Sequence, residues 1–172
     1  MPRLVTVAVS AMTTDAAILE NIDETFGRVE RPEHFADFTH CEECKEHDQT
    51  LRTYDRESLT IKDLGNPGWD PLCFCSANGI AYYFPTLARL ALSEFDPSEG
   101  WYGAQLIFHL YHGFADNRFF QYCSVAQRQT VARFIAHTIE TRASLIDLYG
   151  SADEFLRCHE LWYSSQPAVT SS

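Results

Sequence analysis

The sequence has few basic residues. Its 13 lysines and arginines stand against 24 aspartates and glutamates, which gives a formal net charge of −11 over 172 residues. A field of this sign repels phosphate backbones and anionic lipid headgroups, so we expect no nucleic acid partner. A basic protein partner would be attracted, and attraction of this kind accelerates encounter. The alternative is that the acidic surface only keeps the protein soluble.

Long hydrophobic runs are also missing. Glycine, proline, histidine or arginine interrupts the apolar stretches well before the roughly 20 residues that a membrane-spanning helix needs, so we expect no membrane partner. The start, MPRLVTVAVSAMTT, has one arginine before an apolar stretch broken by Thr6 and Ser10, which is weak for a signal peptide. We therefore expect a cytoplasmic protein whose six cysteines are reduced unless they bind a metal.

Familiar catalytic motifs are absent from the sequence. It has no G-x-G-x-x-G, no Walker-type loop, no G-x-S-x-G and no H-E-x-x-H. The enzyme classes that these motifs mark therefore gain no support. We expect a protein that is not an enzyme, and we keep the enzymatic alternative open.

The distribution of apolar residues predicts the fold. Hydrophobic residues make up 45% of the chain, which is the ordinary globular balance. Helical periodicity predicts a mainly α protein, a single-domain bundle of about five to six helices with at most a small β element. The domain is expected over residues 14–163, with flexible termini at 1–13 and 164–172. Helices are expected at 14–26, 39–54, 76–95 with a kink or restart at Pro85, 101–112, from 125 to about 146, and after Ser151, with one candidate strand at 72–75.

The most distinctive chemistry lies in the segment HCEECKEH. If Thr39 caps the helix, a rotation of about 100° per residue puts its cysteines and histidines on one face. Zinc favours thiolate sulfur and imidazole nitrogen, and side chains three or four residues apart on a helix can reach one ion. We predict that any metal is a structural zinc, held by a Cys/His stripe made of Cys41, Cys44 and His47, with His40 as a further candidate.

Two other interpretations of the Cys/His stripe stay open. Free cysteine behaves as a small hydrophobic residue, so the stripe can be buried core. A C-x-x-C pair near a helix N-terminus is also typical of redox chemistry, because the helix dipole lowers a thiol pKa. The strand-rich context of thioredoxin-like motifs is missing here. A fourth zinc ligand has to come from outside the stripe, from Cys73, Cys75, His109 or His112.

Weaker candidates lie farther along the chain. His109 and His112 share a helical face and could form a metal or acid–base pair, but their aromatic neighbours favour core packing. Asp70, in NPGWDP, is expected to form a turn, with a catalytic carboxylate as the alternative.

Four segments, HCEEC, WDPLCFCSANGIAYYFPTLARLAL, YCSVAQRQTVARFIAHTI and ELWY, together resemble a bacterial family of small single-domain proteins of unknown function. Members of that family have a C-x-E-C segment, a Tyr-Tyr-aromatic-Pro helix, a Gln-Arg helix and a C-terminal tryptophan. The resemblance spans residues 15–163 and implies no activity and no catalytic residues. The chain departs from the family pattern at CFCSANG, where leucine, serine, proline and an acidic residue are more frequent.

Two functions follow from these observations. A small acidic protein-binding module, such as an immunity-type protein that neutralises a basic toxin or another basic partner, agrees with the size, the charge and the missing catalytic motifs. The alternative is a zinc-dependent or thiol-based enzyme that uses the Cys/His stripe of residues 40–48. Such an enzyme needs an open metal position or an activated thiolate. We expect the binding module.

Overall fold

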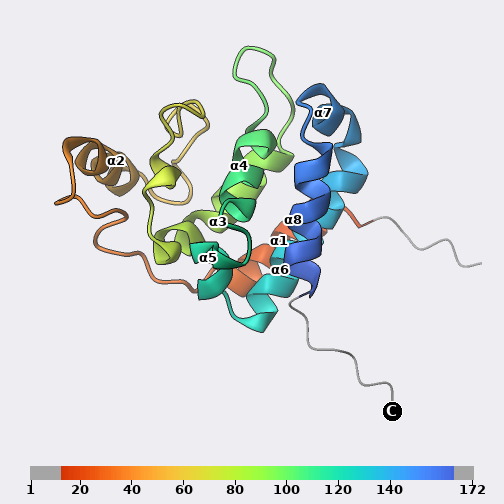
Figure 1. The fold of residues 1–172 in the computed structure, drawn as a ribbon, viewed down its shortest axis with the longest axis horizontal. Helices are drawn as coiled ribbons and strands as arrows, with labels where there is room; N and C mark the ends of the chain where they lie inside the picture. Colours follow the sequence, from red (N-terminus) through yellow and green to blue (C-terminus); the bar gives the residue numbers. More distant parts are fainter. Residues whose placement is uncertain (1–12, 165–172) are drawn as a thin grey trace, which may run out of the picture.

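The computed structural model describes residues 13–164. It confirms the mainly α fold, because these residues form eight α-helices, six of them with ten residues or more, and two short 3-10 helices (Figure 1). The predicted flexible termini lie outside the described residues, except for Thr13 and Ser164. The elements are α1 (Asp15–Phe26), α2 (Glu42–Thr53), η1 (Pro71–Cys73), α3 (Ala77–Leu92), α4 (Tyr102–Tyr111), η2 (Phe114–Asp116), α5 (Arg118–Tyr122), α6 (Val125–Thr141), α7 (Ala143–Leu148) and α8 (Ala152–Ser164).

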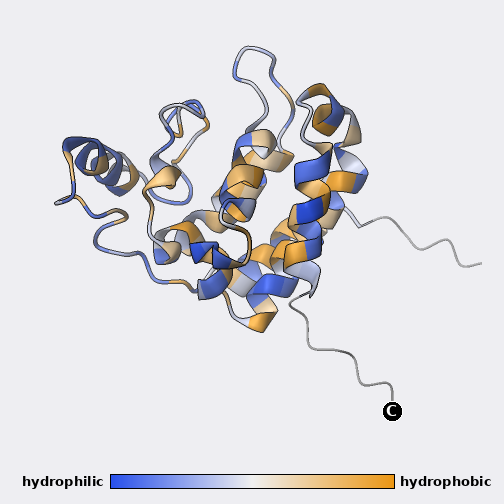
Figure 2. Ribbon diagram, viewed as in Figure 1, coloured by the Kyte–Doolittle hydropathy of each residue, from blue (hydrophilic) through white to orange (hydrophobic). Residues whose placement is uncertain are grey.

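Five of the long helices form the body of the molecule. α1 packs against α3 and α6, α4 packs against α3 and α8, and α6 packs against α8. Their facing sides bury a core rich in aromatic rings, in which the indole nitrogen of Trp162 donates to the carbonyl oxygen of Leu110 at 2.9 Å. α2 lies at the other end of the molecule, packs against η1 and is largely hydrophilic (Figures 1 and 2). None of the described helices combines the length and the apolar character needed to cross a membrane.

Several helices begin where the sequence predicts. Thr14 caps α1 by accepting a hydrogen bond from the amide of Ala17 at 3.2 Å, and Ser76 caps α3. Ser124 and Gln127 form the expected capping box at the start of α6, with both reciprocal hydrogen bonds present. These side chains satisfy amide groups that the first turn of a helix leaves without a partner.

The start of α2 differs from the prediction. The cap is Cys41, whose sulfur accepts a hydrogen bond from the amide of Cys44 at 3.4 Å, and the helix begins at Glu42. Thr39 does not cap it, because Thr39 belongs to the preceding turn, where its amide and hydroxyl both donate to the carboxylate of Asp37 at 3.1 and 2.6 Å. The predicted cap residue therefore belongs to the turn before α2, and the helix begins two residues later than predicted.

The predicted strand at residues 72–75 is wrong. Asp70 caps a 3-10 turn there by accepting from the amide of Leu72 at 2.9 Å, and Pro71 takes the first position, where its missing amide costs nothing. Within residues 13–164 the β structure consists of one isolated bridge between Asp96 and Gly100. The expectation of at most a small β element is confirmed.

Two helices differ in length from the prediction. α3 continues through Pro85 instead of restarting there. Pro85 removes the amide that would donate to the carbonyl oxygen of Ala81, and in the same turn Nε of Arg56 donates at 2.6 Å to the carbonyl oxygen of Tyr82. The long helix expected to reach Ile146 is divided at Arg142, whose guanidinium binds the carbonyl oxygen of Leu92 at 2.6 Å, into α6 and α7.

Candidate metal centre

A group of three possible metal ligands lies at the exposed corner where α2 begins. One ligand atom from each of His40, Cys41 and Cys44 lies within 4.8 Å of the other two. His40 and Cys41 are exposed, whereas Cys44 is 3% exposed. The sulfur of Cys44 lies 3.5 Å from Nδ1 of His40. We call these three residues the corner cluster, and they could hold a metal ion.

Local backbone structure brings the corner cluster together. Cys41 and Cys44 are three residues apart across the first turn of α2, so their side chains meet on one side of the helix start. His40 precedes the cap in a tight turn, in which its amide donates to the carbonyl oxygen of Asp37 at 3.1 Å. The turn places the imidazole over the cysteines although His40 is not helical.

The two thiols of the corner cluster have different acidities. The amide of Cys44, which donates to the sulfur of Cys41, lowers the pKa of Cys41, and contacts with the Cys44 and His40 side chains add to the effect. Burial, followed by the neighbouring Cys41, raises the pKa of Cys44 to about 11. The first thiol therefore loses its proton more readily than an ordinary cysteine, and the second needs a nearby cation to become a thiolate at neutral pH.

The structure does not bring His47 to the corner cluster. Its ring lies on the buried side of α2, 1% exposed, and stacks on Phe74 with a centroid distance of 5.5 Å. Trp69 covers it at 4.8 Å. Nε2 of His47 has no hydrogen-bond partner, and the nearest recorded carboxylate oxygen, from Glu43, is 3.6 Å away. The predicted ligand is thus part of the aromatic contact between α2 and η1.

None of the four proposed outside ligands joins the corner cluster among the described residues. Cys75 is buried in the core, and His112 stacks on Phe108 at the end of α4 with a centroid distance of 4.8 Å. Cys73 and His109 belong to a second close group, together with Asp70. Sequence reasoning missed this second group because it treated 72–75 as a strand. The signal was the spacing of Asp-Pro-Leu-Cys, which puts Asp70 and Cys73 on one helical turn.

A buried carboxylate holds the loop that leads to the corner cluster. Asp48 of α2 accepts hydrogen bonds from the amides of Phe35 and Ala36 at 2.6 and 3.1 Å. Its other oxygen lies 2.7 Å from Nδ1 of His34. These hydrogen bonds join the loop before the corner cluster to the helix after it. They hold in place the backbone on both sides of the three possible ligands.

Comparisons with known proteins give no assignment. No protein-family model, no curated protein and no solved structure matches this chain. The resemblance to a bacterial family of small domains therefore stays a prediction. What the corner can do follows from its own chemistry, since two sulfur atoms and one imidazole nitrogen form a soft ligand set with one side open to solvent.

Proposed function

We propose that the protein is a small acidic protein-binding module whose α2 end is stabilised by one zinc ion in the corner cluster. The observation that carries the proposal is the approach of His40, Cys41 and Cys44 to within 4.8 Å of one another. Thiolates and imidazole favour zinc over magnesium or calcium, which prefer oxygen ligands. A fourth ligand, water or a residue of the partner, would complete a tetrahedral set.

The role of this zinc is structural in our proposal. A divalent cation between Cys41 and Cys44 offsets the repulsion of two adjacent thiolates and stabilises Cys44 as an anion, against the effect of its burial. Because Cys41 is also the cap of α2, the ion fixes the orientation of this helix. The proposal places the protein in the cytoplasm, where unbound thiols stay reduced.

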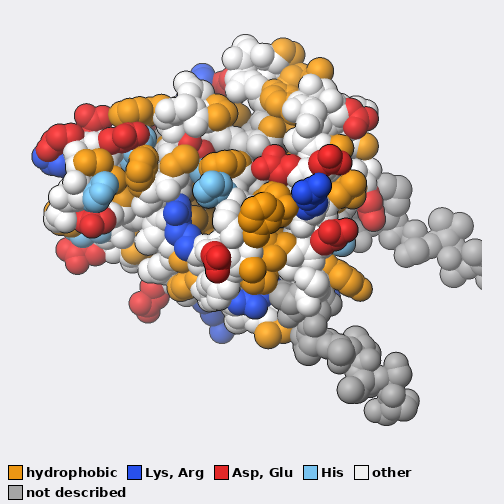
Figure 3. All heavy atoms as spheres, viewed as in Figure 1, with side chains coloured by type: hydrophobic (Ala, Val, Ile, Leu, Met, Phe, Trp, Pro, Cys, Tyr) orange, Lys and Arg blue, Asp and Glu red, His pale blue; other side chains and the backbone are white. Residues whose placement is uncertain are grey.

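The acidic end of the molecule supports binding to a basic partner. Glu42 and Glu46 are exposed on α2, and Glu43 is partly exposed. Figure 3 shows acidic side chains gathered over this end of the molecule. Together with the net charge of −11, they would steer a positively charged protein toward the α2 end. An immunity-type protein that neutralises a basic toxin is one protein of this kind.

The metal part of the proposal is tested by native mass spectrometry of protein purified without chelator. We expect one zinc per chain, lost in Cys41→Ser and in Cys44→Ser. It should be retained in Cys123→Ala, a matched control whose buried thiol lies at the end of α5, outside the corner cluster. Chelation should lower the melting temperature and make Cys41, the exposed thiol of the pair, reactive toward alkylating reagents. An apo mass for the untreated protein, with both thiols reduced, would contradict zinc binding.

A second candidate function is thiol–disulfide exchange at Cys41 and Cys44. The observation that favours it is the asymmetry of the pair, with an exposed sulfur at the helix start and a buried sulfur one turn later. That order suits an attacking thiol and a resolving thiol. Incubation of the protein as purified, without chelator, with oxidised glutathione separates the two candidates. Redox function predicts a Cys41–Cys44 disulfide that dithiothreitol reverses, whereas zinc function predicts that bound zinc blocks the disulfide until a chelator removes it.

A further inference from the structure

The second close group, Asp70, Cys73 and His109, lies outside the corner cluster and contains a buried acid–base pair. Nε2 of His109 in α4 lies 2.5 Å from Oδ2 of Asp70, and both side chains are almost fully buried. Asp70 also accepts hydrogen bonds from Gln105 at 2.7 Å and from the amide of Leu72 at 2.9 Å. Three donors therefore fix this carboxylate, and the carboxylate in turn fixes the imidazole ring.

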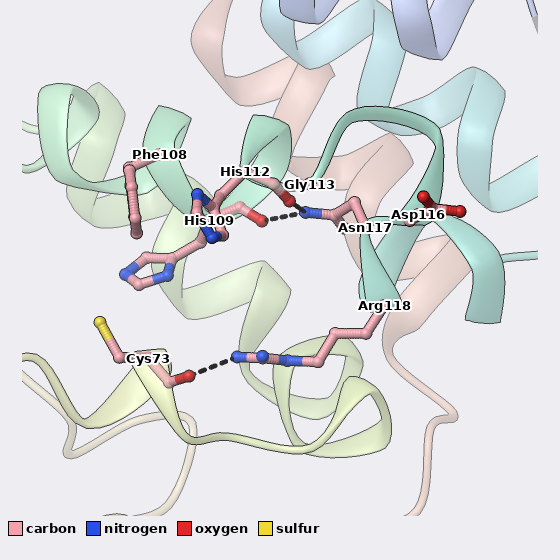
Figure 4. Close-up of a pocket in the computed structure, with 8 residues that line it drawn as sticks. All are labelled: Cys73, Phe108, His109, His112, Gly113, Asp116, Asn117 and Arg118. Carbon is pink, nitrogen blue, oxygen red and sulfur yellow. Dashed lines mark hydrogen bonds between the residues drawn. The ribbon is translucent and has the colours of Figure 1, made fainter.

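Cys73 completes the group from the end of η1. Its sulfur, a ring nitrogen of His109 and a carboxylate oxygen of Asp70 all lie within 4.8 Å of one another. Figure 4 shows the Cys73 side chain directed toward the His109 ring. The guanidinium of Arg118 holds the turn in place by donating to the carbonyl oxygens of Leu72 and Cys73, both at 2.8 Å. The hydrogen bonds from Arg118 therefore hold the backbone that carries the thiol in place.

Cys73 is also within reach of a small molecule. The thiol is partly exposed, and a pocket of about 320 Å³ opens beside it, lined by His109, Phe108, His112 and Arg118 among others (Figure 4). A second pocket is also lined by both Phe108 and Cys73. Cavities of this size suit small ligands, and Arg118, one of the lining residues, brings a positive charge to the pocket.

The hydrogen bonds of Asp70 favour acid–base chemistry over metal binding at this group. A carboxylate only accepts hydrogen bonds, so Nε2 of His109 carries the proton in this contact and Nδ1 keeps its lone pair. A metal on Oδ2 of Asp70 would have to displace the contacts from both His109 and Gln105. A thiol, an imidazole and a buried carboxylate that orients the imidazole match the order of groups in cysteine nucleophile sites.

We propose that Cys73 is the nucleophile of an acyl-transfer site that hydrolyses esters of small carboxylic acids, with His109 as the general base and Asp70 as a positioning residue. As the sulfur attacks the acyl carbon, His109 takes the thiol proton and a C–S bond forms. The ester C–O bond then breaks, and His109 returns the proton to the leaving alcohol. Water next gives a proton to His109 and attacks the thioester. The C–S bond breaks, the carboxylic acid leaves and the sulfur regains its proton.

The environment of Cys73 explains why a base is needed. Burial raises the pKa of this thiol, the charge of Asp70 raises it further, and Arg118 opposes both effects. The thiol is therefore protonated at neutral pH. Attack depends on removal of this proton by His109 and does not start from a thiolate that is already formed. Arg118 then favours the negative charge that develops on the acyl oxygen during the attack.

The test uses p-nitrophenyl acetate as the probe, with the full chain, an acid quench and peptide mapping by mass spectrometry. We expect nitrophenolate release together with an acetyl group on Cys73. Acetylation should be about 100-fold slower in His109→Gln, because general-base assistance contributes on the order of 10²-fold or more. Asp70→Asn should also slow it, and His159→Gln, a matched change on α8 outside both pockets, should leave it unchanged.

Two further measurements keep the proposal open to refutation if the buried variants fail to fold. Acetylation of Cys73 in the unaltered protein should be slower in D₂O, because a proton moves in the rate-limiting attack. Addition of zinc should leave it unchanged. The proposal is overturned by acetyl groups on Cys41 but not on Cys73, by equal rates in H₂O and D₂O, or by zinc that binds at Cys73 and stops the reaction.

Discussion

The carboxylate of Asp48 lies 2.7 Å from Nδ1 of His34, and this contact closes the loop over α2. Asp48 is 2% exposed, so water contributes little to its solvation. The imidazole of His34 and two backbone amides make the contacts with the carboxylate that water would otherwise make. The residue joins the two flanks of the corner cluster, which makes it a sensitive position for the stability of this end of the molecule.

Replacement of Asp48 with asparagine should therefore destabilise the protein. The variant leaves one loop amide or the imidazole without an acceptor, and we expect the free energy of unfolding to fall by about 2 kcal/mol at pH 7. Urea denaturation measures the loss. Asp147→Asn, on the exposed side of α7, is the matched control and should change the free energy of unfolding by less than about 0.5 kcal/mol.

The effect of Asp48 should depend on pH. Burial raises the pKa of Asp48, but hydrogen bonds from His34, Ala36 and Phe35 outweigh burial and leave it below the ordinary value of 3.8. Because the folded pKa is the lower one, the stabilisation is full above roughly pH 4 and is lost as the pH falls through the folded pKa. The difference in the free energy of unfolding between the parent and Asp48→Asn should therefore become smaller as the pH falls. A difference that stays constant down to pH 2 would contradict this account.

Among the side chains that reach the surface, Arg56 should be the one whose loss lowers the free energy of unfolding most. Its guanidinium fills the space between α1 and α3, lies 4.3 Å from the ring of Tyr82 and donates to four carbonyl oxygens, those of Phe26, Gly27, Val29 and Tyr82. Lysine cannot reproduce this planar set of donors. Arg56→Lys should lower the free energy of unfolding by about 2 kcal/mol, whereas Arg133→Lys, on the exposed face of α6, should have little effect. Equal urea midpoints for the two variants would count against this role.

Cys44 should be the least tolerant position of the corner cluster. In chelated protein, Cys44→Asp places a charge at a site that is 3% exposed, so its melting temperature should fall well below that of Cys44→Ala. Cys41→Asp serves as the control, since the neighbouring position is exposed and carboxylates are good helix caps. An unchanged melting temperature for Cys44→Asp would show that the sulfur is not buried in solution.

A basic partner should be captured through the α2 end in a salt-dependent manner. In a pull-down at low salt, the triple variant Glu42→Gln, Glu43→Gln, Glu46→Gln, which removes three negative charges from α2, should recover less of the partner than the parent. The control removes as much charge from the exposed side of α1, with Glu20→Gln, Asp23→Asn and Glu24→Gln. Recovery should fall as salt rises to roughly 0.5 M, where the Debye length is only a few Å. Recovery that does not depend on salt, or that falls equally in the two triple variants, would refute steering by the acidic residues of α2.

The sequence predicted the fold well where local signals act alone. Hydroxyl side chains such as Ser124 begin helices through contacts within one turn, so the sequence shows them directly. The start of α2 could not be read in this way, because Thr39 is diverted by Asp37 and a cysteine replaces it as the cap. The carboxylate of Asp37 holds Thr39 in a turn before the helix, and helical periodicity does not show that contact.

The candidate sites were predictable only in part. Spacing along one helix identified Cys41 and Cys44 as neighbours, and the structure confirms their proximity. Spacing could not show that His47 would turn to the aromatic side chains of another element. The pairing of Asp70 with His109 joins residues 39 positions apart. Contacts of that kind join the cap of η1 to a side chain of α4 and have no periodic signal.

The first hydrogen bond of α2 has a thiol as its acceptor, where most helices have a hydroxyl or a carboxylate. Thiols, unlike hydroxyls, are readily alkylated, oxidised or ligated under mild conditions. Alkylation or oxidation of Cys41 puts a new group on the sulfur that accepts from the amide of Cys44, whereas a bound zinc leaves a sulfur lone pair for that amide. Chemical events at one exposed atom are thereby coupled to the fraying of a helix end. The far-ultraviolet circular dichroism of this protein should consequently report the covalent state of a single cysteine.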